Sequence, residues 1–295
     1  MRRPMYESFY GLREKPFSLT PDPAYFYRSP SHANALDLVT HGIRRREGVI
    51  AITGISGAGK TTLCRTVLET LDRETVTALV LNPYVSDEDL LRLILQDFGV
   101  ISRDEVRRGR LSGVGPAELM RTVHEFLRSL VPLGARALLI VDEAQKLTLP
   151  VLGQIKRLAC LGGTDTLLQI VLVGQLGLRD SLRSAELREL DRRVSIRYRL
   201  RPLTVDETAA YVAHRMAIAG DRASTFTSRA LQRVHRATDG NPRLVNLLCD
   251  RALVTAFASQ ARHAEVDHVA AAARGLGLER ASRPVLSWFR RVAAL

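Results

Sequence analysis

Apolar residues follow two alternating spacings between about residue 32 and residue 200 of the chain. Short apolar runs rich in β-branched residues predict buried strands, whereas apolar positions three and four residues apart predict helices. Strands that alternate with helices form a parallel sheet with helices on both faces, so the pattern predicts an α/β fold. The predicted strands are 48–53, 77–81, 137–141, 168–173 and 194–200, and the predicted helices are about 32–45, 60–71, 87–98, 116–130 and 149–160.

A different pattern precedes the first of these helices. Residues 1–32 are rich in aromatic residues and prolines, and because proline interrupts a helix, we predict an extended segment. Ser31 is the predicted N-cap of the helix that follows, since a serine hydroxyl can accept a hydrogen bond from the first turn.

The strand signals stop near Pro202, and helical signals replace them. Thr204 and Glu207 have the spacing of a capping box, and Asn241 followed by Pro242 is typical of another helix start. The sequence therefore predicts a small helical lid after the sheet. The expected organisation is an extended segment at 1–32, the α/β domain at 33–201, the helical lid at 202–278 and a tail at 279–295.

Composition is that of a globular protein, with 46% hydrophobic and 25% charged residues among 295. The three cysteines, Cys64, Cys160 and Cys249, are scattered and show neither a zinc spacing nor a disulfide framework, so we expect a reducing compartment. No apolar stretch reaches the roughly 18 residues that a membrane-spanning helix needs. The expected location is the cytoplasm.

The formal net charge is +12, and almost all of the excess comes from arginine. Such a charge favours an anionic partner, either nucleic acid, acidic phospholipid or nucleotide. A solvated basic surface with no polyanion partner explains the charge equally well.

A complete P-loop pattern, G-x-x-x-x-G-K-[ST], follows the first predicted strand and opens a helix. The glycines let the backbone N–H groups face phosphates, and the helix N-terminus favours negative charge. Lys60 should reach the β- and γ-phosphates of ATP, and the Thr61 hydroxyl should coordinate Mg²⁺. The predicted nucleotide-binding residues are Gly54, Ile55, Ser56, Gly57, Ala58, Gly59, Lys60, Thr61 and Thr62.

Two carboxylates, Asp142 and Glu143, directly follow the apolar strand 137–141. This arrangement is called Walker B, and it predicts that Asp142 holds Mg²⁺ while Glu143 orients or deprotonates the attacking water. The alternative is an ordinary helix cap. The P-loop upstream favours the catalytic interpretation.

Three further polar positions are candidates for the same site. Gln175 closely follows the predicted strand 168–173. Its amide could hold the lytic water, sense the γ-phosphate or form hydrogen bonds only within its own loop. Arg193, preceded by Arg192, ends a charged helix from which an arginine finger could reach a neighbouring subunit. Arg243 lies in the first turn of a lid helix, where an arginine is unfavourable unless an anion is near, so it is either a nucleotide sensor or a surface residue.

Several motifs outside the P-loop are distinctive. They are Tyr6-Glu-Ser-Phe9, Lys15-Pro16-Phe17, Ser29-Pro-Ser-His32, Val141-Asp-Glu-Ala-Gln145, the run 168–175, Leu200-Arg-Pro-Leu203 and Gly240-Asn-Pro-Arg-Leu-Val-Asn246. With these motifs the chain resembles the ExeA/GspA-type AAA+ ATPases, a group that accompanies type II secretion and type IV pilus systems and includes the pilus ATPase MshM. The resemblance runs from residue 6 to about residue 275.

The resemblance implies an AAA+ core with a C-terminal lid, ATP and Mg²⁺ as ligands, and a nucleotide-dependent homo-oligomer. It also implies an assembly or regulatory role beside an envelope or secretion-system protein. The roles that it implies for single residues are those given above for Lys60, Thr61, Asp142, Glu143, Gln175, Arg193 and Arg243. ExeA proper continues into a transmembrane helix and a peptidoglycan-binding domain, so peptidoglycan binding is not implied. An arginine precedes Arg193 where glutamine is expected, so either arginine could be the finger.

Two other features leave alternatives open. The tail places Trp288 and Phe289 on an apolar helical stripe beside Arg290 and Arg291, which would suit peripheral contact with the inner membrane, a protein partner or the chain's own lid. The basic loop 103–110, together with the net charge, suits duplex DNA and a transposase regulator of the TniB/TnsC kind. A nucleotide switch with little turnover is a third hypothesis, against which Glu143 argues.

Overall fold

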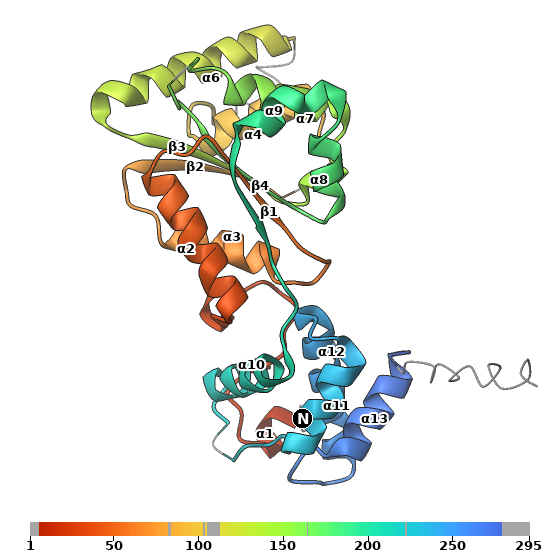
Figure 1. Cartoon of the computed structure of the whole chain (residues 1–295). Coiled ribbons are helices and arrows are strands. Elements are labelled where there is room, and N and C mark those ends of the chain that lie inside the picture. Colours follow the sequence, from red (N-terminus) through yellow and green to blue (C-terminus); the bar gives the residue numbers. More distant parts are fainter. Residues whose placement is uncertain are drawn as a thin grey trace, which may run out of the picture. The chain divides into compact units, whose positions relative to one another are not determined.

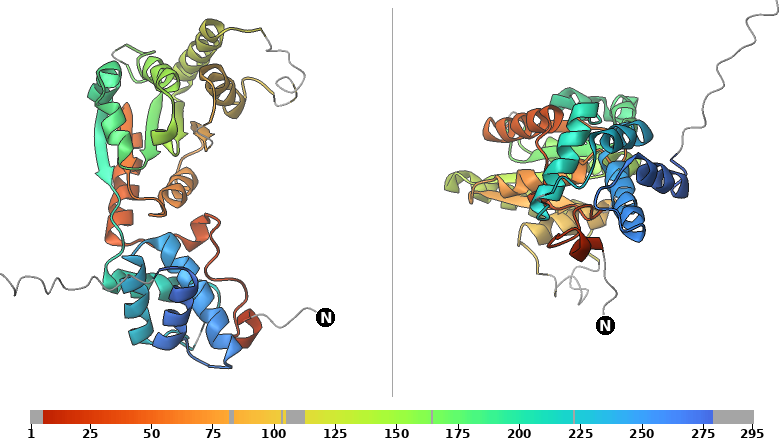
Figure 2. Two further views of the ribbon diagram at one scale, coloured as in Figure 1. Left: turned by 90° about the vertical axis from the view of Figure 1, so that its right-hand side faces the viewer. Right: turned by 90° about the horizontal axis from the view of Figure 1, so that it is seen from below.

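The computed structural model describes residues 6–81, 84–102, 104, 113–163, 165–221 and 223–278. Most of the basic loop 103–110 and the whole tail 279–295 lie outside these residues. Contacts divide the chain into two compact units (Figures 1 and 2). One spans 20–201, and the other combines the described residues up to Leu19 with those from Pro202 onward.

A five-stranded parallel sheet forms the centre of unit 20–201, with the strand order β2-β3-β4-β1-β5. Parallel strands need crossover connections, and the helical segments predicted between the strands supply them. The predicted α/β fold is therefore confirmed. The strands are β1 (Val49–Thr53), β2 (Thr75–Val80), β3 (Arg136–Val141), β4 (Gln169–Gly174) and β5 (Val194–Arg199).

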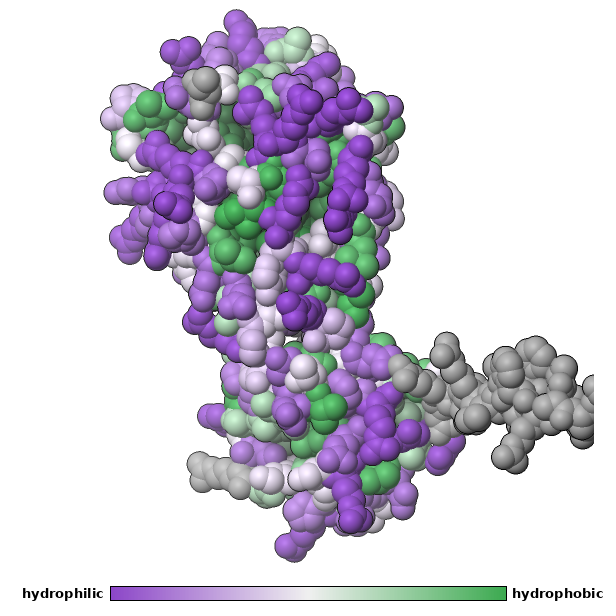
Figure 3. Space-filling view, in the orientation of Figure 1, coloured by the Kyte–Doolittle hydropathy of each residue, from purple (hydrophilic) through white to green (hydrophobic). Residues whose placement is uncertain are grey.

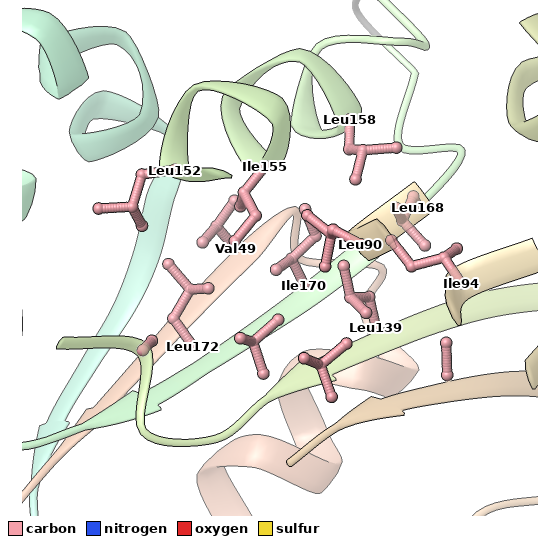
Figure 4. Close-up of a cluster of buried hydrophobic side chains, with 14 of the residues drawn as sticks. Val49, Leu90, Ile94, Leu139, Leu152, Ile155, Leu158, Leu168, Ile170 and Leu172 are labelled. Carbon is pink, nitrogen blue, oxygen red and sulfur yellow. The ribbon is translucent and has the colours of Figure 1, made fainter. Parts of the chain in front are cut away.

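Helices cover both faces of the sheet because successive strand residues point to opposite sides. Figure 4 shows one of the two resulting cores, in which Leu139 and Ile170 meet Leu90 and Ile155. Each such side chain is fully buried, which stabilises the fold by roughly 1.5–3 kcal/mol. Helices α4 (Asp87–Asp97), α6 (Pro116–Leu130), α7 (Leu149–Ala159), α8 (Gly177–Leu182) and α9 (Arg188–Arg193) lie on this face, and α2 (Pro30–Arg44) and α3 (Lys60–Glu69) on the other.

The N-cap of α2 differs from the prediction. The structure uses Ser29, whose hydroxyl accepts from the backbone N–H of His32, and Pro30 occupies the first helical position. Proline suits that position because its missing N–H would be unpaired there. The hydroxyl of Ser31, the predicted cap, instead accepts from the backbone N–H of Arg201 at 3.0 Å.

Four helices build most of the second unit: α10 (Val205–Ile218), α11 (Ser228–Thr238), α12 (Pro242–Ala258) and α13 (Val266–Gly275). Thr204 and Glu207 form the predicted capping box at the start of α10, and Asn241 caps α12. Short helical turns complete the described chain: α1 (Tyr6–Phe9), η1 (Pro23–Tyr25), η2 (Val131–Leu133), η3 (Ala144–Lys146) and η4 (Ala185–Leu187).

The beginning of the chain packs on these helices, so the predicted extended segment 1–32 is divided between the units at Leu19. Buried Arg215 of α10 donates from Nε to the carbonyl of Pro16 and from one terminal nitrogen to that of Ser18, at 3.4 Å. The Tyr6 hydroxyl donates to Asp250 at 2.6 Å, and burial is the main cause that raises the Tyr6 pKa. A sequence pattern could not show these contacts, because the partners lie between 197 and 244 residues apart.

Charged and polar side chains cover much of both units in the face drawn in Figure 3. Among the described residues, no helix is both long and apolar enough to cross a membrane.

Candidate nucleotide site

The P-loop joins β1 to α3 through a turn that depends on glycine. Gly57 and Gly59 have φ values of 79° and 91°, in the left-handed region that residues with a Cβ rarely adopt. Gly54 lies against Leu200, the residue that directly follows β5, since a Cβ there would be 3.2 Å from the Leu200 Cβ. Glycine at these positions lets the chain turn sharply into the N-terminus of α3, where an anion is stabilised.

Lys60, the first residue of α3, is 4% exposed. Its Nζ donates to the carbonyl oxygens of Gly54 at 3.1 Å and Ile55 at 2.9 Å, so the ammonium lies within the turn of the P-loop. A phosphate bound in this loop would therefore meet a positive charge. Of the other predicted binding residues, Ala58 is buried, Ile55, Thr61 and Thr62 are partly exposed, and Ser56 is exposed.

Thr61 and Asp142 meet at the carboxyl end of the sheet. The Thr61 hydroxyl donates to one carboxylate oxygen of Asp142 at 2.5 Å, and Asp142 is 2% exposed. The other oxygen accepts from the backbone N–H of Glu143 at 2.8 Å. A hydroxyl and a carboxylate held together beside a phosphate-binding loop are oxygen ligands suited to Mg²⁺.

Glu143 has φ 53°, a left-handed conformation that is unusual for a residue with a side chain. Its Oε2 accepts from Gln145 Nε2 at 2.9 Å and from Lys146 Nζ at 3.0 Å. Burial raises the pKa of Glu143, but the hydrogen bonds from Lys146 and Gln145 lower it by more. The resulting pKa of Glu143 is below its ordinary value. The carboxylate is therefore ionised at neutral pH, and in this form it can accept a hydrogen bond from water.

Gln175 directly follows β4, and its backbone N–H donates to Gln145 Oε1 at 2.8 Å. Its side chain is partly exposed at the same end of the sheet. The structure thus brings Lys60, Thr61, Asp142, Glu143 and Gln175 to one edge. Whether the Gln175 amide senses the γ-phosphate stays a prediction.

His32 supports the P-loop from α2, a contact that the sequence did not predict. The ring is 5% exposed, with Nδ1 2.8 Å from the Ser29 hydroxyl and Nε2 2.8 Å from the carbonyl of Ala58. It also lies beside Gly59, where a Cβ would be 3.1 Å from Nε2. The sequence did offer a signal for this contact. The motif Ser29-Pro-Ser-His32 is one of those shared with the ExeA/GspA type, although no function was predicted for His32.

Arg193, one of the predicted arginines, forms its hydrogen bonds outside this cluster. Arg193 donates to the carbonyl oxygens of Ala159 at 3.0 Å and Gly163 at 3.3 Å, so its guanidinium binds the end of α7 in its own unit. Arg192 is exposed. Arg243 is exposed in the first turn of α12, in the helical unit, and its role toward a nucleotide stays a prediction.

Comparison with protein families matches residues 43–182 to an AAA domain, AAA_22. Among curated proteins, General secretion pathway protein A of Aeromonas hydrophila is 40% identical over 255 residues, 86% of this chain. The chain spans 45% of the length of that relative. The resemblance to the ExeA/GspA type is therefore confirmed at the level of sequence similarity.

Solved structures with the same fold include Cdc6p from Pyrobaculum aerophilum, at 19% identity and a TM-score of 0.65 over 84% of this chain and 67% of that one. ORC2 of Aeropyrum pernix is 17% identical with a TM-score of 0.66, over 88% of this chain and 71% of that one. The Thermotoga maritima RuvB Holliday junction branch migration motor is 18% identical with a TM-score of 0.57, over 92% of this chain and 74% of that one. At these identities the likeness shows the fold alone. Residues 43–182 thus match an AAA-domain family, in a chain similar over most of its length to General secretion pathway protein A.

Proposed function

We propose that the chain binds ATP with Mg²⁺ and hydrolyses it to ADP and phosphate. The observation that carries the proposal is the junction of Thr61, Asp142 and Glu143 beside the P-loop. Thr61 and Asp142 share a hydrogen bond, and Asp142 also accepts from the N–H of Glu143. The candidate metal ligands, Thr61 and Asp142, and the candidate base, Glu143, are therefore neighbours in space.

Each residue has a part in this proposal. The P-loop N–H groups and Lys60 hold the phosphates, and Thr61 and Asp142 hold Mg²⁺, which neutralises charge on the phosphates. Glu143 orients or deprotonates the attacking water, with Gln175 beside it. Arg243 senses the γ-phosphate, and Arg192 or Arg193 of a neighbouring copy stabilises charge in the transition state.

The biological role we propose is that of an assembly or regulatory factor in a bacterial secretion or type IV pilus-like system. The 40% identity to General secretion pathway protein A supports it. The chain would act as a nucleotide-dependent homo-oligomer in the cytoplasm or at the periphery of the inner membrane. Its direct partner would be an envelope or secretion-system protein.

The net charge of +12 favours a second candidate, a DNA-binding ATPase that regulates a transposase. Arginines that neutralise DNA phosphates make binding strongly dependent on salt. This candidate therefore predicts that duplex DNA binds and stimulates hydrolysis, and that both effects weaken as salt rises.

The test is phosphate release by the wild type and by Glu143→Gln at several protein concentrations, with and without duplex DNA and anionic liposomes. Stimulation by liposomes, or indifference to both additions, supports the secretion-type role. Stimulation by DNA supports the transposase-type role. Release by the wild type that never exceeds that of Glu143→Gln contradicts the proposed hydrolysis.

A further inference from the structure

Gln145 lies between the candidate base and the neighbouring strand. Its Nε2 donates to Glu143 Oε2 at 2.9 Å, and its Oε1 accepts from the backbone N–H of Gln175 at 2.8 Å. The side chain thus joins the turn after β3 to the end of β4, across thirty residues of sequence. Neither the P-loop nor the Walker B pattern assigns a role to this position.

The two contacts fix the orientation of the Gln145 amide. A carboxylate can only accept a hydrogen bond and a backbone N–H can only donate one, so a flipped amide would lose both bonds. Gln145 is also only partly exposed, which reduces competition from water. One rotamer of Gln145 therefore holds one Glu143 carboxylate oxygen at a fixed place relative to β4.

The fold makes room for this side chain at Gly174. A Cβ added there would be 2.7 Å from Gln145 Oε1 and 3.2 Å from the Gln145 backbone nitrogen. The last residue of β4 must therefore be small for the bridge to form.

Lys146 also contacts Glu143, but it differs in kind. Its side chain is 42% exposed, and its Nζ pairs with Oε2 of a residue only three positions earlier in the same short turn. An exposed pair of this type contributes little positional restraint, since water and salt compete for both charges. Gln145 instead connects Glu143 to a different strand of the sheet.

We propose that Gln145 is a positioning residue for hydrolysis: it holds the Glu143 carboxylate in register with the end of β4, where Gln175 lies. The proposal rests on the proposed ATPase function. Because the bridge touches the Gln175 backbone, a shift at the end of β4 moves the base. The two hydrogen bonds of the Gln145 side chain go to Glu143 and to the Gln175 backbone, not to the P-loop, Thr61 or Asp142. Its loss therefore affects turnover and leaves nucleotide affinity intact.

The test compares Gln145→Leu with the wild type, with Gln232→Leu on the exposed surface of α11 as a matched control for the substitution. We expect kcat for ATP to fall at least about 10-fold, since misplacement of a catalytic group by about 1 Å can cost 100-fold. KM and the Kd for ATP should stay within about twofold, and Gln232→Leu should match the wild type. Gln145→Glu keeps the acceptor for Gln175 but loses the donor, so it should also lose turnover.

The double variant Glu143→Gln/Gln145→Leu identifies the route of the effect. If Gln145 acts through Glu143, the double variant has the same residual rate as Glu143→Gln alone. A further 10-fold loss in the double variant, an unchanged kcat in Gln145→Leu, or a parallel loss of ATP affinity would each overturn the positioning role. Failure of the ATPase proposal itself is distinguishable, because the wild type would then release no more phosphate than Glu143→Gln, which overturns both proposals.

Discussion

Side chains at the carboxyl ends of β3 and β4 are held by short bonds to their neighbours in space. Glu143 is in a left-handed conformation that is costly for a residue with a side chain, by about 1–3 kcal/mol. Asp142 offsets part of that cost by accepting from the Glu143 N–H. The orientation of the Glu143 carboxylate thus costs the fold some stability, which is typical of a residue placed for function.

Lys60 and Glu143 should separate binding from turnover when each is changed alone. Lys60→Ala removes the buried positive charge of the P-loop, so we expect ATP affinity to fall at least about 10-fold. Glu143→Gln keeps the size of the side chain but removes its basicity, so phosphate release should fall at least about 100-fold while ATP still binds. Titration with a fluorescent ATP analogue, together with a phosphate-release assay, checks both. Equal loss of affinity in the two variants would contradict these roles.

At the level of elements, the sequence predicted most of what is regular. The five strands fall within about two residues of their predicted limits, because β-branched runs bounded by turns identify buried strands well. The P-loop and Walker B were predictable because their residues are close in sequence. Ser31 was wrongly predicted as the cap of α2, because Pro30 fits the first helical position and this places the cap at Ser29.

Contacts between distant segments could not be predicted in this way. The bridge from Gln145 to Gln175 and the bond from His32 to Ala58 depend on which strands and helices become neighbours. The same holds for the end of α7, where Arg193 binds two carbonyl oxygens. Local pattern determines the elements, whereas these contacts depend on their arrangement.

The junction between α11 and α12 gives a prediction about stability. Gly240 has φ 69°, and a Cβ there would lie 1.8 Å from the Leu203 carbonyl oxygen. We expect Gly240→Ala to lower the free energy of unfolding of the helical unit by at least about 1–3 kcal/mol. Gly275→Ala in α13, where a Cβ would meet nothing within 4 Å, is the control and should be neutral. Urea denaturation followed by circular dichroism measures both, and equal midpoints would show the prediction to be wrong.

Arg215 gives a second prediction, at the contact between α10 and the beginning of the chain. Arg215→Met keeps the stem but leaves the carbonyls of Pro16 and Ser18 and the Tyr211 hydroxyl without their cationic donor. We expect the free energy of unfolding of the helical unit to fall by about 1.5–3 kcal/mol, and amide hydrogen exchange in residues 6–19 to become faster. Arg215→Lys keeps the charge without the fork and should lie between the two. Exchange in 6–19 that matches the wild type would contradict the contact.

For the whole molecule, the proposed oligomer makes hydrolysis depend on protein concentration. An arginine supplied by a neighbouring copy can contribute about 1,000-fold or more. If exposed Arg192 is that residue, Arg192→Ala should abolish the rise in specific activity with concentration and leave stability unchanged. Arg193→Ala should lower stability instead, because Arg193 binds the carbonyls of Ala159 and Gly163. Phosphate release across a concentration series, with thermal unfolding alongside, distinguishes them, and the reverse result would make Arg193 the finger.

The helical unit is assembled from both ends of the chain, and this has a consequence for synthesis on the ribosome. Pro16 and its partner Arg215 are separated by 199 positions. At about 5–20 residues per second, the ribosome needs roughly 10–40 s to make the residues that the first segment packs against. Phe17, which packs on Phe226 in the finished protein, must wait through that interval with the rest of its segment. Residues 6–19 are therefore made long before their partners, and they are among the last parts of the helical unit to fold.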